Sequence, residues 1–179
     1  MLKSILKTAS LVAFLAFSFS RCALFTPVEG PRQPHNPSRA GGGATTVVDE
    51  STRKRKEVVD FAKGYLGTPY RAAGKDPRGF DCSGFTGYVM KNFGVTLSGS
   101  SKYQAKEGRK VNIKEVKPGD LIFFRRSPAG EVFHVALVVR NSRDGIEVIH
   151  SASRGVVIEN ISESDYWRPK ISSARDVLQ

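Results

Sequence analysis

Residues 67–94 read GTPYRAAGKDPRGFDCSGFTGYVMKNFG, a glycine-rich loop that turns into a helix near Cys82. Phe85, Val89 and Phe93 are four residues apart, which is the spacing of one helix face. A cysteine in the first turn of a helix lies beside unpaired backbone N–H groups and the positive end of the helix dipole. Because both stabilise an anion, we expect a lowered pKa for the Cys82 thiol.

Two further helices are expected around this segment. The first is capped by Ser51 or Thr52 and ends at Gly67, with apolar residues recurring at helical spacing between them. The second is short and follows the loop after the cysteine helix, where Ser101 and Gln104 form a capping box.

The second half of the chain changes from helical to strand periodicity. Four short segments rich in valine, isoleucine and phenylalanine are separated by turn residues, which is typical of antiparallel strands. They are Asp120–Phe124, Phe133–Arg140, Ile146–Ser151 and Val156–Ile161. Helices followed by such strands predict an α+β domain, with the helices packed on one face of an antiparallel β-sheet.

Two of the three histidines, His134 and His150, fall on neighbouring predicted strands. If Arg140 opposes Ile146, both imidazoles share one face of the sheet as diagonal neighbours, with backbones about 7 to 8 Å apart. A tight turn that pairs Arg143 with Ile146 would place the imidazoles on opposite faces. We therefore expect a wider loop or a bulge between the two strands.

Cys82 and these two histidines are candidates for nucleophilic catalysis. A cysteine nucleophile needs a base, and the base needs a further group that orients its ring. Each residue alone also fits an ordinary buried side chain, since cysteine and strand histidines are often buried. The catalytic interpretation therefore depends on the sequence around them.

Five short blocks surround these residues and occur in one order. They are GTPYRAAG (67–74), FDCSGF (80–85), KPGDLIFF (117–124), FHVALVV (133–139) and EVIHSAS (147–153). Together they resemble the NlpC family of cell-wall cysteine peptidases, over about Lys54 to Trp167. The resemblance implies a papain-like core, with the cysteine at a helix N-terminus packed against an antiparallel sheet.

The resemblance also implies a reaction. It makes Cys82 the nucleophile, His134 the general base and His150 the group that orients the base. Members of the family hydrolyse the amide between D-γ-glutamyl and a diamino acid, meso-diaminopimelate or lysine, in peptidoglycan stem peptides. No metal and no cofactor are implied. A related cell-wall amidase and a catalytically silent wall-binding lipoprotein are the alternatives.

Three more positions match the family pattern. The resemblance implies that the Tyr70 hydroxyl contributes to the oxyanion site and that Asp81 and Ser83 border the substrate groove. Asp81 fits a helix N-cap equally well. Residues 97–101, LSGSS, depart from the pattern, because relatives often carry a proline and a basic residue before a Ser/Thr-Ser pair.

Residues 1–21 have the layout of a secretory signal peptide, in which Lys3 and Lys7 precede an apolar run. The segment ends before Cys22 and resembles a bacterial lipoprotein signal, whose cysteine is lipidated and becomes the N-terminus. Cleavage before Arg21 by a conventional signal peptidase is the alternative. We expect an exported protein of the bacterial cell envelope, anchored to a membrane through a lipid on Cys22 or otherwise secreted.

The chain of 179 residues is expected to contain three parts: a signal peptide (1–21), a Pro/Gly-rich tether (22–50) and one peptidase domain (51–179). Two cysteines without a C-x-x-C pattern support neither a disulfide scaffold nor a structural zinc site. The net charge of +11 favours anionic partners, but no nucleic-acid motif accompanies it. We therefore expect no nucleic-acid partner, and we expect a monomer. The family resemblance implies peptidoglycan stem peptides as the substrate.

Overall fold

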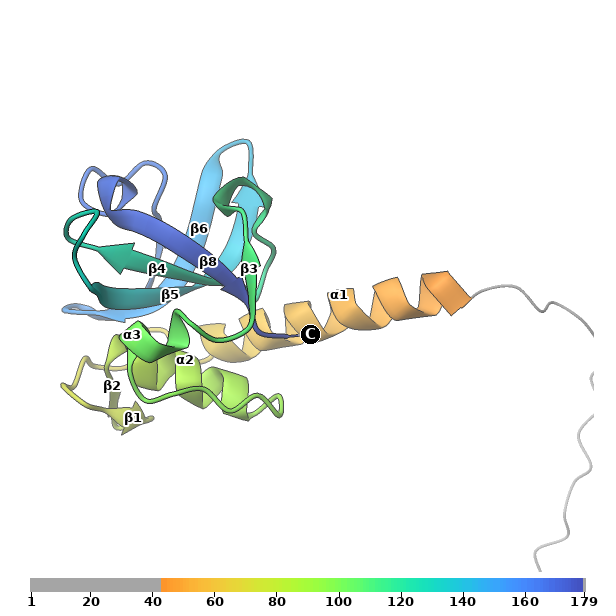
Figure 1. Cartoon of the computed structure of the whole chain (residues 1–179). Coiled ribbons are helices and arrows are strands. Elements are labelled where there is room, and N and C mark those ends of the chain that lie inside the picture. Colours follow the sequence, from red (N-terminus) through yellow and green to blue (C-terminus); the bar gives the residue numbers. More distant parts are fainter. Residues whose placement is uncertain (1–42, 179) are drawn as a thin grey trace, which may run out of the picture. The chain divides into compact units, whose positions relative to one another are not determined.

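The computed structural model describes residues 43–178, so the expectations for the signal peptide, the lipid on Cys22 and most of the tether lie outside the described residues. Figure 1 shows a helical layer, with a small two-stranded ribbon, against a larger sheet. The elements are α1 (Gly43–Lys63), β1 (Lys75–Asp76), β2 (Gly79–Phe80), α2 (Cys82–Lys91), α3 (Ser101–Gln104), β3 (Arg109–Val111), β4 (Leu121–Arg125), β5 (Val132–Ser142), β6 (Gly145–Ala152), β7 (Gly155–Asn160) and β8 (Ile171–Asp176).

The main sheet has six strands in the order β3-β8-β4-β5-β6-β7, and every neighbouring pair is antiparallel. The four expected strands form its consecutive part, β4 to β7, and the expected α+β class is confirmed. Strands β3 and β8 were not expected. The last strand of the chain, β8, inserts between β3 and β4.

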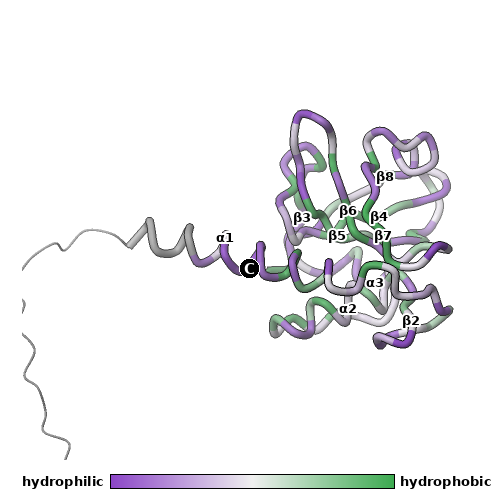
Figure 2. The backbone as a smooth tube through the Cα atoms, turned by 180° about the vertical axis from the view of Figure 1, so that it is seen from behind, coloured by the Kyte–Doolittle hydropathy of each residue, from purple (hydrophilic) through white to green (hydrophobic). Residues whose placement is uncertain are grey.

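Apolar side chains fill both sides of this sheet. On one side, Val58, Phe85 and Met90 from the helices meet Phe123 and Leu137 from the strands. Figure 2 shows the hydrophobic residues concentrated along β4, β5 and β6. A second buried cluster on the other side includes Ile122, Phe124, Ala136, Val138, Val148, Ile161 and Trp167.

Helix α1 begins earlier than expected. A cap at Ser51 or Thr52 is wrong, because the helix continues N-terminally to Gly43. No proline or glycine lies between residues 44 and 52 to interrupt it.

Arg55 links α1 to the sheet through two ion pairs. Its guanidinium nitrogens lie 2.8 Å from Oδ1 of Asp120 and 2.8 Å from Oδ1 of Asp176. The side chains of both carboxylates are almost wholly buried, with 2% and 7% exposed. Asp120 immediately precedes β4, and Asp176 ends β8. One helix residue therefore bridges two neighbouring parts of the sheet.

A bulge in β5 decides which way the two histidines face. Near the turn, Arg140 pairs with Glu147, but Val138 pairs with Val148, so the register shifts by one residue between these pairs. Because side chains alternate between the faces of a strand, a shift by one residue exchanges the faces. The extra residue thereby places both histidines on the same side. The expected bulge is confirmed, whereas the loop is tight, because Ser142 pairs with Gly145.

The first turn of α2 packs directly on the backbone of the preceding loop. The N–H of Asp81 donates to the carbonyl oxygen of Gly74 at 3.0 Å. A Cβ built on Gly84 would lie 1.9 Å from that same oxygen. Only glycine therefore permits this approach, which sets the position of Cys82 at the start of the helix.

The expected capping box in α3 is wrong. Ser100 is the N-cap of this one-turn helix, and no side-chain hydrogen bond caps it. Gln104 is fully buried, and its amide nitrogen donates to the carbonyl oxygens of Ser83 at 3.0 Å and Ser98 at 2.8 Å. A buried amide needs such partners, and these bonds turn Gln104 towards α2 rather than towards its own helix.

Candidate active site

A cleft of about 700 Å³ lies where the start of α2 meets strands β5, β6 and β7. Tyr70, Cys82 and His134 line it. His150 is fully buried beside the cleft and contacts His134. The structure therefore brings together the four residues expected to carry the chemistry.

Cys82 is the first residue of α2, as expected, and its side chain is partly buried. Burial raises the pKa of the Cys82 thiol, and the neighbouring Asp81 carboxylate also raises it. Backbone N–H groups, foremost that of Val135, lower this pKa without outweighing burial. The expected lowering of the pKa is therefore wrong for the resting protein, in which the imidazole of His134 is uncharged and offers the thiolate no positive charge.

The two histidines are in direct contact. Nε2 of His134 lies 2.8 Å from Nδ1 of His150, and the two rings are inclined by 80°. This contact engages Nε2 of His134 and leaves Nδ1 as the ring nitrogen for a partner in the cleft. A hydrogen bond to one nitrogen fixes the orientation of an imidazole.

Burial keeps both imidazoles neutral. It lowers the pKa of His134 to about 3, and a positive charge on His150, when that ring is protonated, acts in the same direction. Burial also lowers the pKa of His150, although the carboxylate of Glu159 opposes this. At neutral pH both rings are uncharged, so His134 is free to accept a proton.

Glu159 extends the histidine pair, although it stands in none of the sequence motifs around Cys82, His134 and His150. It lies two residues beyond Val157, the direct partner of His150 on β7, and so on the same face. Its Oε2 is 2.8 Å from Nε2 of His150 and 2.8 Å from Nε1 of Trp167. Glu159 is the diagonal neighbour of His150 across the β6–β7 pair, so the register of these two strands would have indicated it.

Backbone pairing holds Tyr70 at the rim of the cleft. The N–H of Gly67 donates to the carbonyl of Val156, and the N–H of Val156 donates to that of Thr68, both at 2.9 Å. Tyr70 itself forms a bridge with Phe80. Its side chain is 47% exposed. The expected part of its hydroxyl in an oxyanion site stays a prediction.

Asp81 and Ser83 lie outside the lining of this cleft. Asp81 caps α2, because its carboxylate accepts the N–H of Gly84 at 2.6 Å. The buried hydroxyl of Ser83 lies 3.0 Å from that carboxylate and 3.1 Å from the carbonyl oxygen of Gly99. Ser83 instead lines a separate pocket of about 720 Å³ beside α2. Substrate contacts through these two residues stay predictions.

Two arginines give the cleft a positive lining. Arg126 lies over the ring of Phe133, with its guanidinium carbon 4.6 Å from the ring centre. Arg154 forms an ion pair with Oε1 of Glu159. Both arginines line the cleft together with Cys82. A carboxylate on a bound ligand would find complementary charge here.

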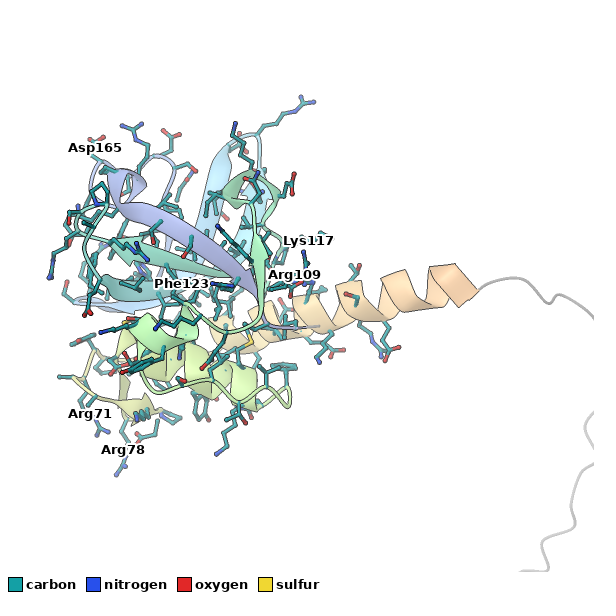
Figure 3. All side chains as sticks on the ribbon, viewed as in Figure 1. Arg71, Arg78, Arg109, Lys117, Phe123 and Asp165 are labelled. Carbon is teal, nitrogen blue, oxygen red and sulfur yellow. The ribbon has the colours of Figure 1, made fainter. Side chains whose placement is uncertain are left out.

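Other arginines near the start of α2 are directed elsewhere. Arg71 and Arg78 pair with Oδ2 of Asp76, at 3.5 and 2.9 Å. Figure 3 shows both at the outer edge of the β1–β2 ribbon, away from the sheet. Neither belongs to the cleft lining.

The described part of the chain contains no group of three His, Cys, Asp or Glu side chains placed to hold a metal ion. Between residues 43 and 178, none of the helices combines the length and apolarity of a membrane span. The cleft itself offers a thiol, an imidazole backed by a second one, two phenols, two guanidinium groups and a carboxylate.

Comparison with known proteins gives a consistent result. Residues 67–176 match the NlpC/P60 family. The Escherichia coli K12 protein named murein DD-endopeptidase MepS/murein LD-carboxypeptidase is 30% identical over 156 residues, which are 80% of this chain and 79% of the relative. A Bacillus cereus γ-D-glutamyl-L-lysine dipeptidyl-peptidase is 36% identical over 121 residues, which are 66% of this chain and 35% of the relative.

Solved structures agree with the fold. The crystal structure of an NlpC/P60 family protein from Bacillus cereus superposes with a TM-score of 0.65 at 35% identity. The match covers 70% of this chain and 40% of that protein. Some relatives are much longer, and the matched region makes up only 23% and 18% of two of them.

Proposed function

Because the chain belongs to the NlpC/P60 family, we propose that it is a cell-wall cysteine peptidase that hydrolyses the D-γ-glutamyl–diamino acid bond of peptidoglycan stem peptides. One observation carries the proposal. A thiol at a helix N-terminus and an imidazole backed by a second imidazole line the same cleft. This arrangement of nucleophile, base and orienting group is that of thiol hydrolases.

The first half of the reaction forms an acyl-enzyme. Nδ1 of His134 takes the proton of the Cys82 thiol as sulfur attacks the scissile carbonyl carbon. The carbonyl oxygen becomes an oxyanion, which accepts hydrogen bonds from the backbone N–H of Cys82 and the hydroxyl of Tyr70. The tetrahedral intermediate then breaks its C–N bond, and His134 gives the proton to the leaving amine, which leaves a thioester on Cys82.

The second half releases the acid. His134 takes a proton from a water molecule, whose oxygen attacks the thioester carbonyl. The C–S bond then breaks, and the proton returns to the sulfur of Cys82. His150 keeps the ring of His134 in the same orientation through both halves, because their contact uses the nitrogen that does not exchange protons with the substrate.

The positive lining supports an acidic substrate. A γ-linked glutamyl residue keeps its α-carboxylate free, close to the scissile amide, and Arg126 offers that group a guanidinium already stacked on Phe133. The Bacillus cereus relative carries the γ-D-glutamyl-L-lysine linkage in its name. Both observations favour the same bond.

A second candidate bond is the peptide cross-link between two stems. The Escherichia coli relative, which this chain matches over most of both lengths, is named a murein DD-endopeptidase and LD-carboxypeptidase. The same thiol chemistry applies to that amide, so only the position of the substrate in the cleft would differ.

We also propose export and anchoring for this protein. The charged and apolar layout of residues 1–21 and the position of Cys22 support a lipid-anchored protein of the bacterial cell envelope. Such a location places the peptidase domain beside its polymeric substrate, where it would act as a monomer.

The decisive experiment is digestion of purified peptidoglycan with the full chain, followed by mass analysis of the soluble products. Wild type is compared with Cys82→Ala, which removes the nucleophile without adding volume, and with Arg78→Ala, which removes a cation outside the cleft. We expect new D-glutamyl carboxyl groups with wild type and Arg78→Ala and none with Cys82→Ala. Thermal unfolding of all three proteins checks that they are folded.

The other products each contradict this assignment in a recognisable way. Loss of cross-linked dimers without cleavage at glutamate would favour the second candidate bond. Muramic acid freed from L-alanine would identify an amidase. Unchanged peptidoglycan that nevertheless retains the folded protein would identify a wall-binding lipoprotein without catalytic activity.

A further inference from the structure

The carboxylate of Glu159 lies at the end of a continuous line of hydrogen-bonding groups that starts in the cleft. Nε2 of His134 is 2.8 Å from Nδ1 of His150, and Nε2 of His150 is 2.8 Å from Oε2 of Glu159. The three residues come from β5, β6 and β7, which are consecutive neighbours in the sheet. Every link is therefore held by paired strands rather than by loops.

The other partners of Glu159 can only donate. The indole N–H of Trp167 lies 2.8 Å from Oε2, and the guanidinium of Arg154 contacts Oε1. Neither an indole nor a guanidinium has an acceptor site, so each donates to an oxygen of Glu159, and donors on both oxygens favour the ionised carboxylate. Their contacts and that of His150 hold the pKa of Glu159 below its usual range, although burial acts in the opposite direction. Glu159 is thereby fixed as an acceptor.

This acceptor determines where the protons of both imidazoles lie. Because Glu159 can only accept, Nε2 of His150 must carry the hydrogen. A neutral His150 then has a lone pair on Nδ1, which accepts the hydrogen on Nε2 of His134. A neutral His134 in turn has its lone pair on Nδ1, the nitrogen that the proposed reaction uses.

We propose that Glu159 is a positioning residue that fixes the tautomers of His150 and His134, so that the basic nitrogen of His134 faces the cleft. The inference rests on the proposed function only in its effect on turnover, since the tautomers themselves exist without substrate. His150 is wholly buried, and solvent cannot supply the same constraint. Without the carboxylate, the opposite arrangement becomes available, in which Nδ1 of both imidazoles carries the hydrogen and His134 presents a donor to the thiol.

The direct test reads the tautomers. The chain contains three histidines, so ¹⁵N-labelled histidine gives a simple long-range ¹H–¹⁵N spectrum. In a Cys82→Ala background at neutral pH, we expect His134 and His150 to be protonated on Nε2 and bare on Nδ1. Glu159→Gln should shift both residues towards hydrogen on Nδ1, because a glutamine amide both donates and accepts.

Turnover provides the second readout. Glu159→Gln should lower kcat by about 100-fold, with KM little changed, because the substrate still binds but most molecules hold the wrong tautomer. Glu159→Asp keeps an acceptor-only carboxylate and should restore part of kcat. Glu163→Gln removes the same charge from an exposed carboxylate four residues away and should match wild type.

The outcomes separate the inference from the proposed function. Unchanged histidine tautomers in Glu159→Gln would overturn the inference, whether or not the protein is an enzyme. Altered tautomers with kcat kept at the wild-type level would overturn the link to catalysis. A wild-type protein that cleaves no peptidoglycan would overturn the proposed function, and the spectrum would still decide the role of Glu159.

Discussion

The indole ring of Trp167 lies against the imidazole of His134, with ring centres 4.6 Å apart and planes inclined by 27°. The same indole donates its N–H to Glu159, whose carboxylate also bonds His150. One buried tryptophan therefore contacts both the proposed base, through its ring face, and the carboxylate behind it, through its nitrogen. The two contacts can be separated by substitution.

Trp167→Phe keeps an aromatic face beside His134 but removes the N–H bond to Glu159. We expect a loss of about 1 kcal/mol in the free energy of unfolding, the usual worth of one hydrogen bond, and a moderate fall in kcat. Trp167→Ala removes both contacts and should cost about 3 to 5 kcal/mol. Urea unfolding and steady-state kinetics measure the two effects, and equal kinetics for Trp167→Phe and Trp167→Ala would contradict a role for the ring face.

The buried histidines make the fold sensitive to acid. The pKa of His134 falls to about 3 in the folded protein, against an ordinary value of about 6.5 in the unfolded chain. Between these values the unfolded state binds more protons, so the free energy of unfolding decreases as the pH falls from about 6.5 towards 3. Urea titrations across this range should show a shallower pH dependence for His134→Gln than for wild type, and identical slopes would contradict the assignment.

Arg126 should discriminate between charged and uncharged substrates. If its guanidinium binds the α-carboxylate of the γ-linked glutamyl residue, Arg126→Gln lowers kcat/KM by about tenfold for a D-isoglutamate substrate, which corresponds to one charge-assisted hydrogen bond. A D-isoglutamine substrate, which lacks that charge, should be affected much less. Arg78→Gln serves as the control, since Arg78 pairs with Asp76 outside the cleft. Equal losses on both substrates would refute charge recognition.

Arg55 should matter for stability rather than for chemistry. Arg55→Met removes the guanidinium that bonds two buried carboxylates, Asp120 and Asp176, and we expect a loss of about 3 to 5 kcal/mol in the free energy of unfolding. Arg53→Met is the matched control, because its partner Glu57 is 3.7 Å away and both side chains are exposed. Thermal unfolding compares the two variants, and a similar decrease in both would contradict the prediction.

Local sequence patterns were sufficient to predict the central part of the fold. The spacing of Phe85, Val89 and Phe93 predicted the helix that begins at Cys82, and short segments rich in valine, isoleucine and phenylalanine between turn residues predicted strands β4 to β7. These features depend on neighbours along the chain. Strand β8 pairs with two strands far from it in sequence, and its residues, ISSARD, carry little apolar alternation. Nothing in its local composition indicates where it inserts.

In the candidate site, too, some residues could be predicted from local sequence and others depend on the folded structure. Tyr70, Cys82 and His134 stand in short motifs, and the structure places them around one cleft. Glu159 and Trp167 lie in no such motif, and their roles depend on strand register and on a loop folding back over β5. The pKa of Cys82 depends on how much water the folded protein excludes, which composition alone does not reveal.

The bulge in β5 gathers His134, His150 and Glu159 into one meander of successive hairpins, whereas Cys82 arrives from the helical layer. The thiol of Cys82 and the imidazole of His134 therefore belong to two different layers of the fold, the helices and the sheet. A 2.7 Å hydrogen bond from the Ser151 hydroxyl on β6 to the carbonyl oxygen of Phe80 helps to hold the two layers together. A small separation of the two layers would move the thiol away from its base while the strand pairing of β5, β6 and β7 stays intact. On heating, catalytic activity should therefore be lost at a lower temperature than the secondary structure that circular dichroism measures.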